Sequence, residues 1–219
     1  MSQSTPEPGD GIAGNVRPDL LAGQHFPPPP QQERSRRKRD ALLEAALALF
    51  AEKGYEATSI EEIAHRAGVA VGGFYQHFAS KRQLLLVLMN RLLDEVESLP
   101  AQLSPDQLDY PRAVIEQVVR QGLLTDWAYV GAYRAWREAV VQERELQALH
   151  VSIEEWTAWR IEMMLRAMQQ GPGARSDVDL VTMAAIVSLL FWRLAETPLD
   201  EPDAVIASIT DLIYHALFT

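Results

Sequence analysis

Hydrogen-bond donors that suit phosphate oxygens gather between residues 58 and 81. They are a hydroxyl at Thr58, a phenol at Tyr75, an imidazole at His77 and an ammonium at Lys81. Such groups at helix ends position a protein on a nucleic-acid backbone without reading its base sequence. The alternative for Tyr75 and His77 is that these side chains only pack and cap the fold.

Small residues fill the sequence between those donors. They are Ala70, Val71, Gly72 and Gly73. Each glycine costs about 1 kcal/mol relative to alanine inside a helix. That cost is tolerable where another backbone, such as a phosphate strand, must approach closely. Ala70 and Val71 could contact thymine methyl groups, so we expect a docking surface at this stretch.

A basic run precedes this region and includes Arg36, Arg37 and Lys38, which could reach phosphate or the minor groove. Residues 34 to 82 hold nine Lys or Arg against six Asp or Glu, a balance of +3, whereas the whole chain carries −10. The remaining residues must therefore carry −13. Only residues 34 to 82 suit a polyanion, although a basic run is often merely a solvated face.

Apolar periodicity and capping residues predict the helices that position these side chains. A first amphipathic helix follows the basic run and stops at Gly54. Thr58 and Ser59 offer hydroxyl caps for a second helix, which ends at Gly68. Gly68 would supply the left-handed residue of a tight turn.

The third helix of this region is expected to cover residues 69–78, with Phe74 and Phe78 pointing into the core. Ser80 caps a fourth helix, which begins at Lys81 and continues to about residue 97. Helix, short turn and helix is the resulting pattern.

The register of these residues resembles the N-terminal DNA-binding domain of the tetracycline-repressor (TetR/AcrR) family over about residues 36 to 96. The types that carry the resemblance are Ala45, Ala46, Phe50, Gly54, Tyr55, Thr58, Ile63, Ala64, Ala67, Gly68, Val69, Gly72, Tyr75, His77, Phe78, Lys81, Leu84 and Leu85. Val71 departs from the polar or basic residue common in the family, and Phe74 from leucine.

The resemblance implies that the third helix enters the major groove of DNA. Thr58, Tyr75, His77 and Lys81 match family positions that hold phosphates, and the small residues from Ala70 to Gly73 match positions near base edges. Ser59 is included in the expected contact set. Val71, Gly72 and Gly73 offer no long polar side chain that could hydrogen-bond to base edges.

Beyond residue 97 the pattern stays helical and predicts an all-α fold. Helices are expected near 109–123, 126–147, 150–170, 177–196 and 202–217, separated by proline and glycine. All five tryptophans lie in this part. Aromatic and methionine side chains at helical spacing form either plain core or a ligand cage. The candidates for a ligand site are Trp127, Tyr133, Trp136, Arg137, Trp156, Arg160, Met163 and Phe191.

Two further properties of this part come from its apolar surface and from the resemblance. Residues 179–196 are apolar nearly all round, so both sides of this helix must be covered. A second subunit, paired through the last two helices, would cover one side and would present two recognition helices to a palindrome. The resemblance implies the same dimer and a pocket for a small effector.

Enzymatic chemistry has little support in the sequence. His150 and Glu154 could give two metal ligands, and Glu138 could act as a base, but no third ligand, nucleophile or phosphate loop accompanies them. The chain has no cysteine. We therefore expect no catalytic residues, metal or cofactor.

The first 33 residues contain seven of the thirteen prolines and show no periodicity, which predicts a disordered tail. The expected organisation is this tail at 1–33, a helix-turn-helix domain at 34–96 with the motif at about 59–78, and an effector-binding and dimerisation domain at 97–219. No apolar run reaches the roughly 18 residues that a membrane span needs, so a cytoplasmic location is expected.

The sequence thus predicts a regulator that binds double-stranded DNA, most simply a repressor released from a palindromic operator by a small apolar or aromatic molecule. The alternatives are a DNA-binding protein whose C-terminal domain only dimerises or binds a protein partner, an architectural DNA-binding protein without an effector, and, remotely, a helical enzyme.

Overall fold

A computed structural model describes residues 16–28, 32–99, 108–197 and 200–219, and helices connected by short segments make up this part of the chain. The predicted all-α fold is confirmed. Its helices are α1 (Glu33–Lys53), α2 (Ile60–Arg66), α3 (Val71–Tyr75), α4 (Lys81–Ser98), α6 (Pro111–Ala128), α7 (Val130–Gln142), α8 (Arg144–Gln169), α9 (Leu180–Glu196) and α10 (Pro202–Phe218).

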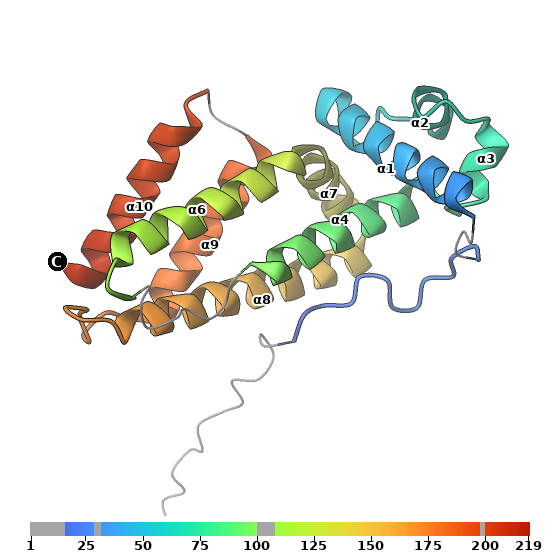
Figure 1. Ribbon diagram of the computed structural model, residues 1–219. Helices are drawn as coiled ribbons and strands as arrows, with labels where there is room; N and C mark the ends of the chain where they lie inside the picture. Colours follow the sequence, from blue (N-terminus) through green and yellow to red (C-terminus); the bar gives the residue numbers. More distant parts are fainter. Residues whose placement is uncertain (1–15, 29–31, 100–107, 198–199) are drawn as a thin grey trace, which may run out of the picture.

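The helices form two groups along an elongated molecule (Figure 1). Helices α1, α2 and α3 gather at one end, and α6, α9 and α10 lie at the other, with α8 running along them. Helices α4 and α7 lie between the two groups. One buried core joins α1 to α4 with α7 and part of α8, and a second core joins α6, α8, α9 and α10.

Local capping explains where the first helices begin. The Ser59 hydroxyl accepts from the Glu62 amide at 3.2 Å, and the Glu62 carboxylate accepts from the Ser59 amide at 2.9 Å, which closes a capping box on α2. Ser80 caps α4 through the Gln83 amide at 3.1 Å. Gly68 has φ +68°, the left-handed conformation expected of the turn before α3.

Several predicted boundaries are wrong. Helix α3 covers five residues instead of 69–78, because Ala70 is extended and Gln76 already ends the helix. The helix predicted over 126–147 is divided, since the non-helical Tyr129 separates α6 from α7. Glu143 is extended and is the N-cap of α8, so this helix begins at Arg144 and not near residue 150 as predicted.

The segment 16–28 also differs from the predicted disordered tail. Its Leu20 side chain is 1% exposed and belongs to the first core. Arg17 donates to the Asn90 carbonyl at 3.0 Å, and the Gln83 side-chain amide donates to the His25 carbonyl at 3.0 Å. The segment therefore runs alongside α4. Residues 1–15 and 29–31, the rest of the predicted tail apart from 32–33 at the start of α1, lie outside the described residues.

Helix α7 holds the first group of helices tightly. A Cβ atom on Gly131 would lie 1.9 Å from the Leu47 carbonyl oxygen of α1, so only glycine permits this close helix approach. Arg134 donates to the Ala51 carbonyl at 2.8 Å, at the C-terminal end of α1. Helices α7 and α1 are therefore in direct contact along this stretch.

Candidate nucleic-acid interface and ligand cavity

Helix α3 exposes one face and buries the other. Phe74 and the following Phe78 are fully buried, whereas Val71 is 37% and Tyr75 is 51% exposed. Gly72 is exposed beside them. This face of small residues and one phenol is accessible to a large partner.

The two glycines of α3 are not required by the packing of the described residues. Neither has a positive φ. A Cβ atom on Gly72 would meet nothing within 4 Å, and one on Gly73 would make only ordinary contact, 3.5 Å from Cβ of Val69. The protein therefore accepts the helix-propensity cost of Gly72 without gaining an internal contact.

Two predicted phosphate contacts, Thr58 and Lys81, are engaged inside the protein. The Thr58 hydroxyl, 1% exposed, donates its single hydrogen to the Gly54 carbonyl at 2.7 Å. The Lys81 ammonium donates to the Tyr55 carbonyl at 2.6 Å and the Thr58 carbonyl at 2.8 Å, above the Tyr55 ring. Thr58 has no hydrogen left for a phosphate in this geometry, and Lys81 keeps one N–H.

His77 and Ser59 also serve the fold. His77 is 6% exposed, and neither ring nitrogen has a hydrogen-bond partner among the described residues. Burial, reinforced by Arg39 and Lys38, lowers the His77 pKa and keeps the ring neutral. The packing alternative is therefore favoured for His77. The Ser59 hydroxyl is used in the capping box of α2.

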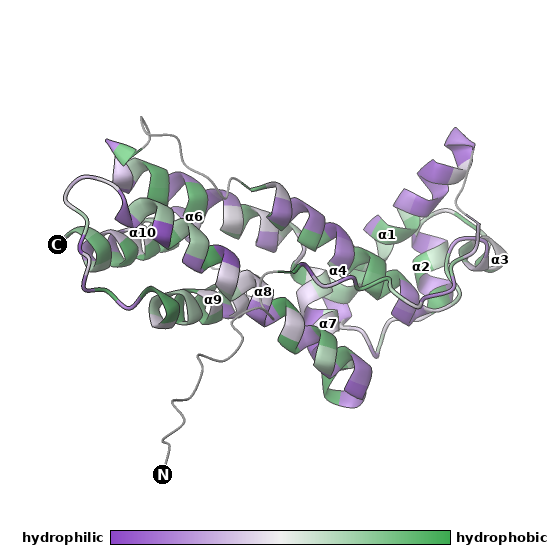
Figure 2. Ribbon diagram, turned by 90° about the horizontal axis from the view of Figure 1, so that it is seen from below, coloured by the Kyte–Doolittle hydropathy of each residue, from purple (hydrophilic) through white to green (hydrophobic). Residues whose placement is uncertain are grey.

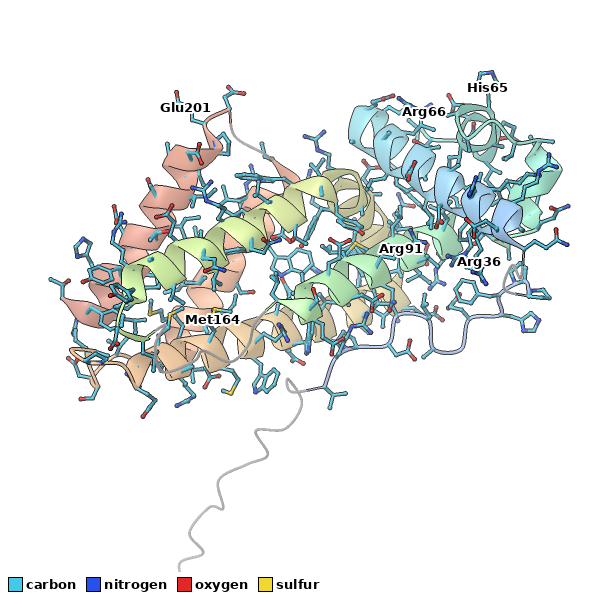
Figure 3. All side chains as sticks on the ribbon, in the orientation of Figure 1. Arg36, His65, Arg66, Arg91, Met164 and Glu201 are labelled. Atoms are coloured by element: carbon cyan, nitrogen blue, oxygen red, sulfur yellow. The ribbon has the colours of Figure 1, made fainter. Side chains whose placement is uncertain are left out.

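The basic run begins helix α1, so its side chains are carried on a rigid element. Arg36, Arg37 and Lys38 are exposed there, and Arg37 pairs with Glu33 at 3.1 Å. Figure 3 shows Arg36 beside the N-terminal end of α1 and His65 projecting from the outer side of α2. These groups lie at the same end of the molecule as α3.

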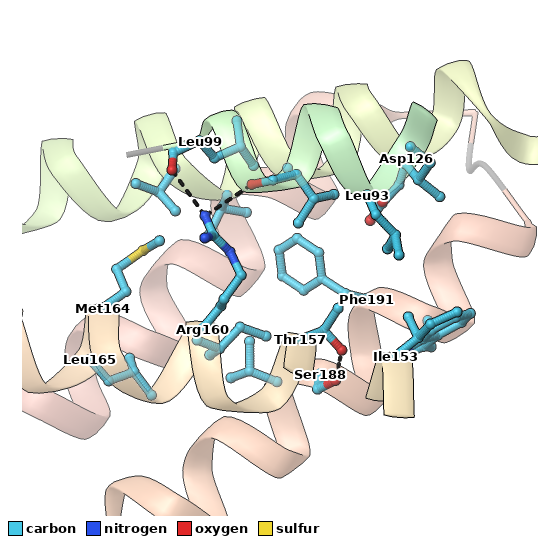
Figure 4. Close-up of a pocket in the computed structure, with 18 of the residues that line it drawn as sticks. Leu93, Leu99, Asp126, Ile153, Thr157, Arg160, Met164, Leu165, Ser188 and Phe191 are labelled. Carbon is cyan, nitrogen blue, oxygen red and sulfur yellow. Dashed lines mark hydrogen bonds between the residues drawn. The ribbon is translucent and has the colours of Figure 1, made fainter. Parts of the chain in front are cut away.

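A partly open cavity of about 130 Å³ lies among α4, α6, α7, α8 and α9. Most of its wall is aliphatic, with Met89, Leu92, Val119 and Met164 as examples. Its polar lining residues are Asp126, Tyr133, Thr157, Arg160 and Ser188. Figure 4 shows Asp126 and Arg160 on different sides of Phe191, with Thr157 hydrogen-bonded to Ser188. An apolar cavity with a few polar groups is suited to a small organic ligand.

Only three of the predicted ligand residues line this cavity: Tyr133, Arg160 and Phe191. The others have different contacts. The Trp127 indole donates to the Leu194 carbonyl at 3.1 Å. Trp136 and Trp156 are buried in the first core, at 1% and 2% exposure.

Arg137 pairs with Glu196 at 2.7 Å and lines a separate pocket with Trp136. At the end of α8, Met164 lines the cavity in place of the predicted Met163. Neighbouring positions such as Met163 and Met164 point about 100° apart around the helix axis, and sequence periodicity does not resolve that difference.

Asp126 lines the cavity but is absent from the predicted ligand residues, although the sequence contains a signal for it. Ile115, Val119, Gly122 and Asp126 recur at three- and four-residue spacing, so they lie on one face of α6. A carboxylate on an otherwise apolar helix face is a candidate site residue. Asp126 is 5% exposed and accepts a hydrogen bond from the Tyr133 hydroxyl at 2.7 Å.

The residues considered for an enzyme have other roles. His150 accepts from the Trp136 indole at 3.3 Å and lies 3.6 Å from Glu154. The Glu138 carboxylate accepts from the Tyr55 amide at 2.8 Å, which joins α7 to the turn after α1. Within the described residues no group of three or more His, Cys, Asp or Glu could hold a metal ion.

Apolar side chains remain exposed on α9 and α10. Val181, Ile186 and Leu189 of α9 are 57%, 51% and 65% exposed, and Leu212 of α10 is 50% exposed. Much of the ribbon of these two helices is hydrophobic in Figure 2. Four large apolar residues of α10 are buried within the chain: Ile206, Ile209, Ile213 and Leu217. Among the described helices, none is long and apolar enough to cross a membrane.

Similarity to known proteins is concentrated in the first helices. A family model described as bacterial regulatory proteins, tetR family, matches residues 42–88. The repressor KstR2 of Mycobacterium tuberculosis is 46% identical over 57 residues, 26% of this chain and 28% of that protein. The uncharacterized regulator YuxN of Bacillus subtilis is 43% identical over 60 residues, 27% of this chain and 21% of the relative. The chain thus spans less than a third of each of these two relatives.

A longer match and the solved structures extend the likeness beyond the first helices. KstR2 of Rhodococcus jostii is 29% identical over 158 residues, 70% of this chain and 76% of that protein. The regulator PfmR of Thermus thermophilus has a TM-score of 0.62 at 19% identity, over 80% of this chain and 97% of that one. AibR, solved with isovaleryl coenzyme A and operator DNA, has a TM-score of 0.59 at 22% identity, over 83% and 98%. At such identities the solved structures show the fold alone. The order of the helices, the family model and these relatives agree, and residues 42–88 of this chain belong to the tetR family of bacterial regulatory proteins.

Proposed function

We propose that this protein is a ligand-responsive transcriptional regulator, a repressor that leaves a palindromic operator when a small molecule fills the cavity beside α7. The single observation that carries the proposal is that α7 contributes Tyr133 to the cavity and also holds α1 through Gly131 and Arg134. Cavity and DNA-binding helices thus share one rigid element.

The DNA contacts are proposed to come from the exposed face of α3 and from the start of α1. Ala70, Val71, Gly72 and Gly73 would lie against the duplex, and Tyr75 would donate to a phosphate. Arg36, Arg37 and Lys38 would add charge contacts, and Lys81 would offer its remaining N–H. Thr58, Ser59 and His77 would hold α2 and α3 in place instead of touching DNA.

A homodimer is proposed because the exposed apolar residues of α9 and α10 need a cover. Its interface would use Val181, Ile186, Leu189 and Leu212. A two-fold dimer would place two copies of α3 about 34 to 36 Å apart, one turn of duplex, or a multiple of that spacing. Movement of α7 would then change the spacing and lower operator affinity.

The domain division at 34–96 and 97–219 stays a proposal, and the shared core of α1, α4 and α7 supports strong coupling across it. A cytoplasmic location is proposed because a regulator must reach chromosomal DNA. The structural neighbour AibR was solved with isovaleryl coenzyme A and operator DNA together, which supports a similar combination of ligands for this chain.

The test is footprinting on the DNA upstream of the gene, followed by titration of the operator with and without a cavity ligand. We expect a protected palindrome, weaker operator binding with ligand, and weaker ligand binding with operator by the same factor. Uniform protection along all DNA would contradict sequence-specific regulation.

A second candidate function is a DNA-binding protein whose C-terminal helices only dimerise or bind a protein partner. The exposed apolar face of α9 favours it. Operator affinity that stays constant while the cavity is filled would support this alternative over ligand control.

A further inference from the structure

The cavity contains two groups of opposite charge, Asp126 and Arg160, and their surroundings compensate these charges unequally. Arg160 donates through one nitrogen to the carbonyls of Val96 at 3.0 Å, Glu97 at 3.3 Å and Leu99 at 3.0 Å. These carbonyls belong to the C-terminal end of α4, where the helix dipole is negative. The guanidinium also lies 5.3 Å from the centre of the Trp156 ring, so its charge is well compensated.

Asp126 lacks such compensation. The Tyr133 hydroxyl, a neutral donor, is the one hydrogen-bond partner of its carboxylate among the described residues. The Asp126 side chain is buried, and aliphatic residues of α4, α6 and α8 surround the cavity that it lines. Burying an ionised carboxylate with a single neutral hydrogen-bond donor costs free energy, because the charge has lost its water. A cation bound beside the carboxylate would offset that cost most effectively.

We propose that the Asp126–Tyr133 pair recognises a positively charged amine carried at one end of an otherwise apolar effector. This assignment rests on the proposed function, because it names the ligand class of the same cavity. The carboxylate would accept from the ammonium group, and Tyr133 would keep the carboxylate oriented. The aliphatic walls and Phe191 would surround the apolar body of the ligand.

The size of the cavity limits the ligand that it accepts without rearrangement. Its volume of about 130 Å³ is close to the roughly 150 Å³ of an apolar cavity that binds benzene. A single ring with a short amine arm therefore makes a suitable probe. A Cβ atom on Gly122 would lie 2.9 Å from the Phe191 ring, so this ring packs closely against the α6 backbone.

Amine recognition by this pair depends on pH in a defined direction. Burial raises the pKa of Asp126 from 3.8 to about 7, and the hydrogen bond from Tyr133 opposes part of that rise. Tyr133 and Arg160 are the other titratable groups of the cavity lining. The amine binds the ionised carboxylate, so its affinity should rise by about tenfold between pH 6 and pH 8.

The experiment uses the full-length protein and three probes of similar shape: benzylamine, benzyl alcohol and benzoate. Ligand-observed NMR titration and calorimetry measure the dissociation constants at pH 6, 7 and 8. We expect wild type to bind benzylamine at least tenfold more tightly than the other two, and Asp126→Asn to lose both this preference and the pH dependence. Asp177→Asn, which removes an exposed carboxylate on another part of the chain, is the matched control and should behave as wild type.

Tyr133→Phe provides a second, independent measurement. Without its hydrogen bond the carboxylate is harder to ionise, so the midpoint of the pH profile should move upward. Equal binding of benzoate or benzyl alcohol, failure of all three probes to bind, an unmoved midpoint in Tyr133→Phe, or wild-type benzylamine affinity in Asp126→Asn would each overturn the proposal. Operator affinity is measured separately. If benzylamine binds through Asp126 but operator affinity is unchanged, ligand control of DNA binding fails while amine recognition stands.

Discussion

At the scale of single residues, two side chains of the same type have different roles when one is exposed and the other is buried. Tyr75 is half exposed on α3, whereas Tyr133 is 8% exposed and donates to a buried carboxylate. The sequence predicts phosphate binding for Lys81, but its ammonium is mostly occupied by two carbonyls at the turn before α2. The donor chemistry of a side chain therefore makes it a candidate for phosphate binding, and its solvent exposure decides whether it can reach a phosphate.

Gly72 provides a residue-scale test of the DNA interface. We expect Gly72→Ala to stabilise the fold by up to about 1 kcal/mol, because its methyl group meets no protein atom. Operator affinity should fall by tenfold or more, since the methyl group projects from the face proposed to touch DNA. Thermal denaturation and gel-shift titration measure the two effects. Unchanged operator affinity would show that DNA does not approach this glycine.

Asp126 provides a second test at this scale, through stability and pH. Its pKa is raised to about 7 in the folded chain, so the folded state binds the proton more tightly than the unfolded state. The contribution of protonated Asp126 to the unfolding free energy is largest below the unfolded-state pKa of about 4. It is lost as the pH rises from there through the folded-state pKa of about 7. Asp126→Asn removes this loss, so its advantage in unfolding free energy over wild type should be larger at pH 8 than at pH 5, by about 2 kcal/mol. Equal differences at both pH values, in chemical denaturation, would refute the raised pKa.

At the scale of elements, α7 and the segment 16–28 contact regions that the sequence predicts to be separate. Helix α7 joins the DNA-binding helices to the cavity, and the segment 16–28 joins the predicted tail to α4. Helix α7 contacts α1 through Gly131 and Arg134, contacts the turn after α1 through Glu138, and lines the cavity through Tyr133. These contacts make α7 the candidate for transmitting ligand binding to the DNA-binding helices.

The segment 16–28 should contribute to stability because it covers α4. Leu20→Ala removes a fully buried side chain, and we expect it to lower the unfolding free energy by about 2 kcal/mol. Val16→Ala in the same segment is the control, since Val16 is 70% exposed, and it should change stability little. A Leu20→Ala variant as stable as the control would show that the segment does not pack on α4 in solution.

At the scale of the whole molecule, the exposed apolar face on α9 and α10 determines the assembly that we propose. Apolar side chains of this size rarely cluster on a surface without a partner. The isoleucines of α10 pack inside the chain, so Val181, Ile186 and Leu189 of α9 supply most of the large side chains of the exposed face. A two-fold dimer would bury this face against its own copy.

The dimer is tested by placing a charge in this face. Leu189→Glu should shift the protein toward monomer in light scattering coupled to gel filtration, because a buried carboxylate at a symmetric contact is opposed by its copy. Operator binding should weaken with it, as one half-site is lost. Leu124→Glu on α6, where the side chain is 49% exposed, is the control. A monomeric wild type, or a dimeric Leu189→Glu variant, would contradict this interface.

The sequence by itself determined the helical class, the order of the first helices and their caps at Ser59, Gly68 and Ser80. These features follow from periodicity and from hydrogen bonds between residues only a few positions apart. The tertiary structure decided which aromatic side chains line the cavity, because Trp136 and Trp156 lie on apolar helix faces that could have met either core or cavity. Only the crossing of α4, α6, α7, α8 and α9 placed Asp126 and Tyr133 there. The packing of residues 16–28 likewise rests on contacts between residues more than 50 positions apart, such as Arg17 with Asn90 and His25 with Gln83, which no local pattern encodes.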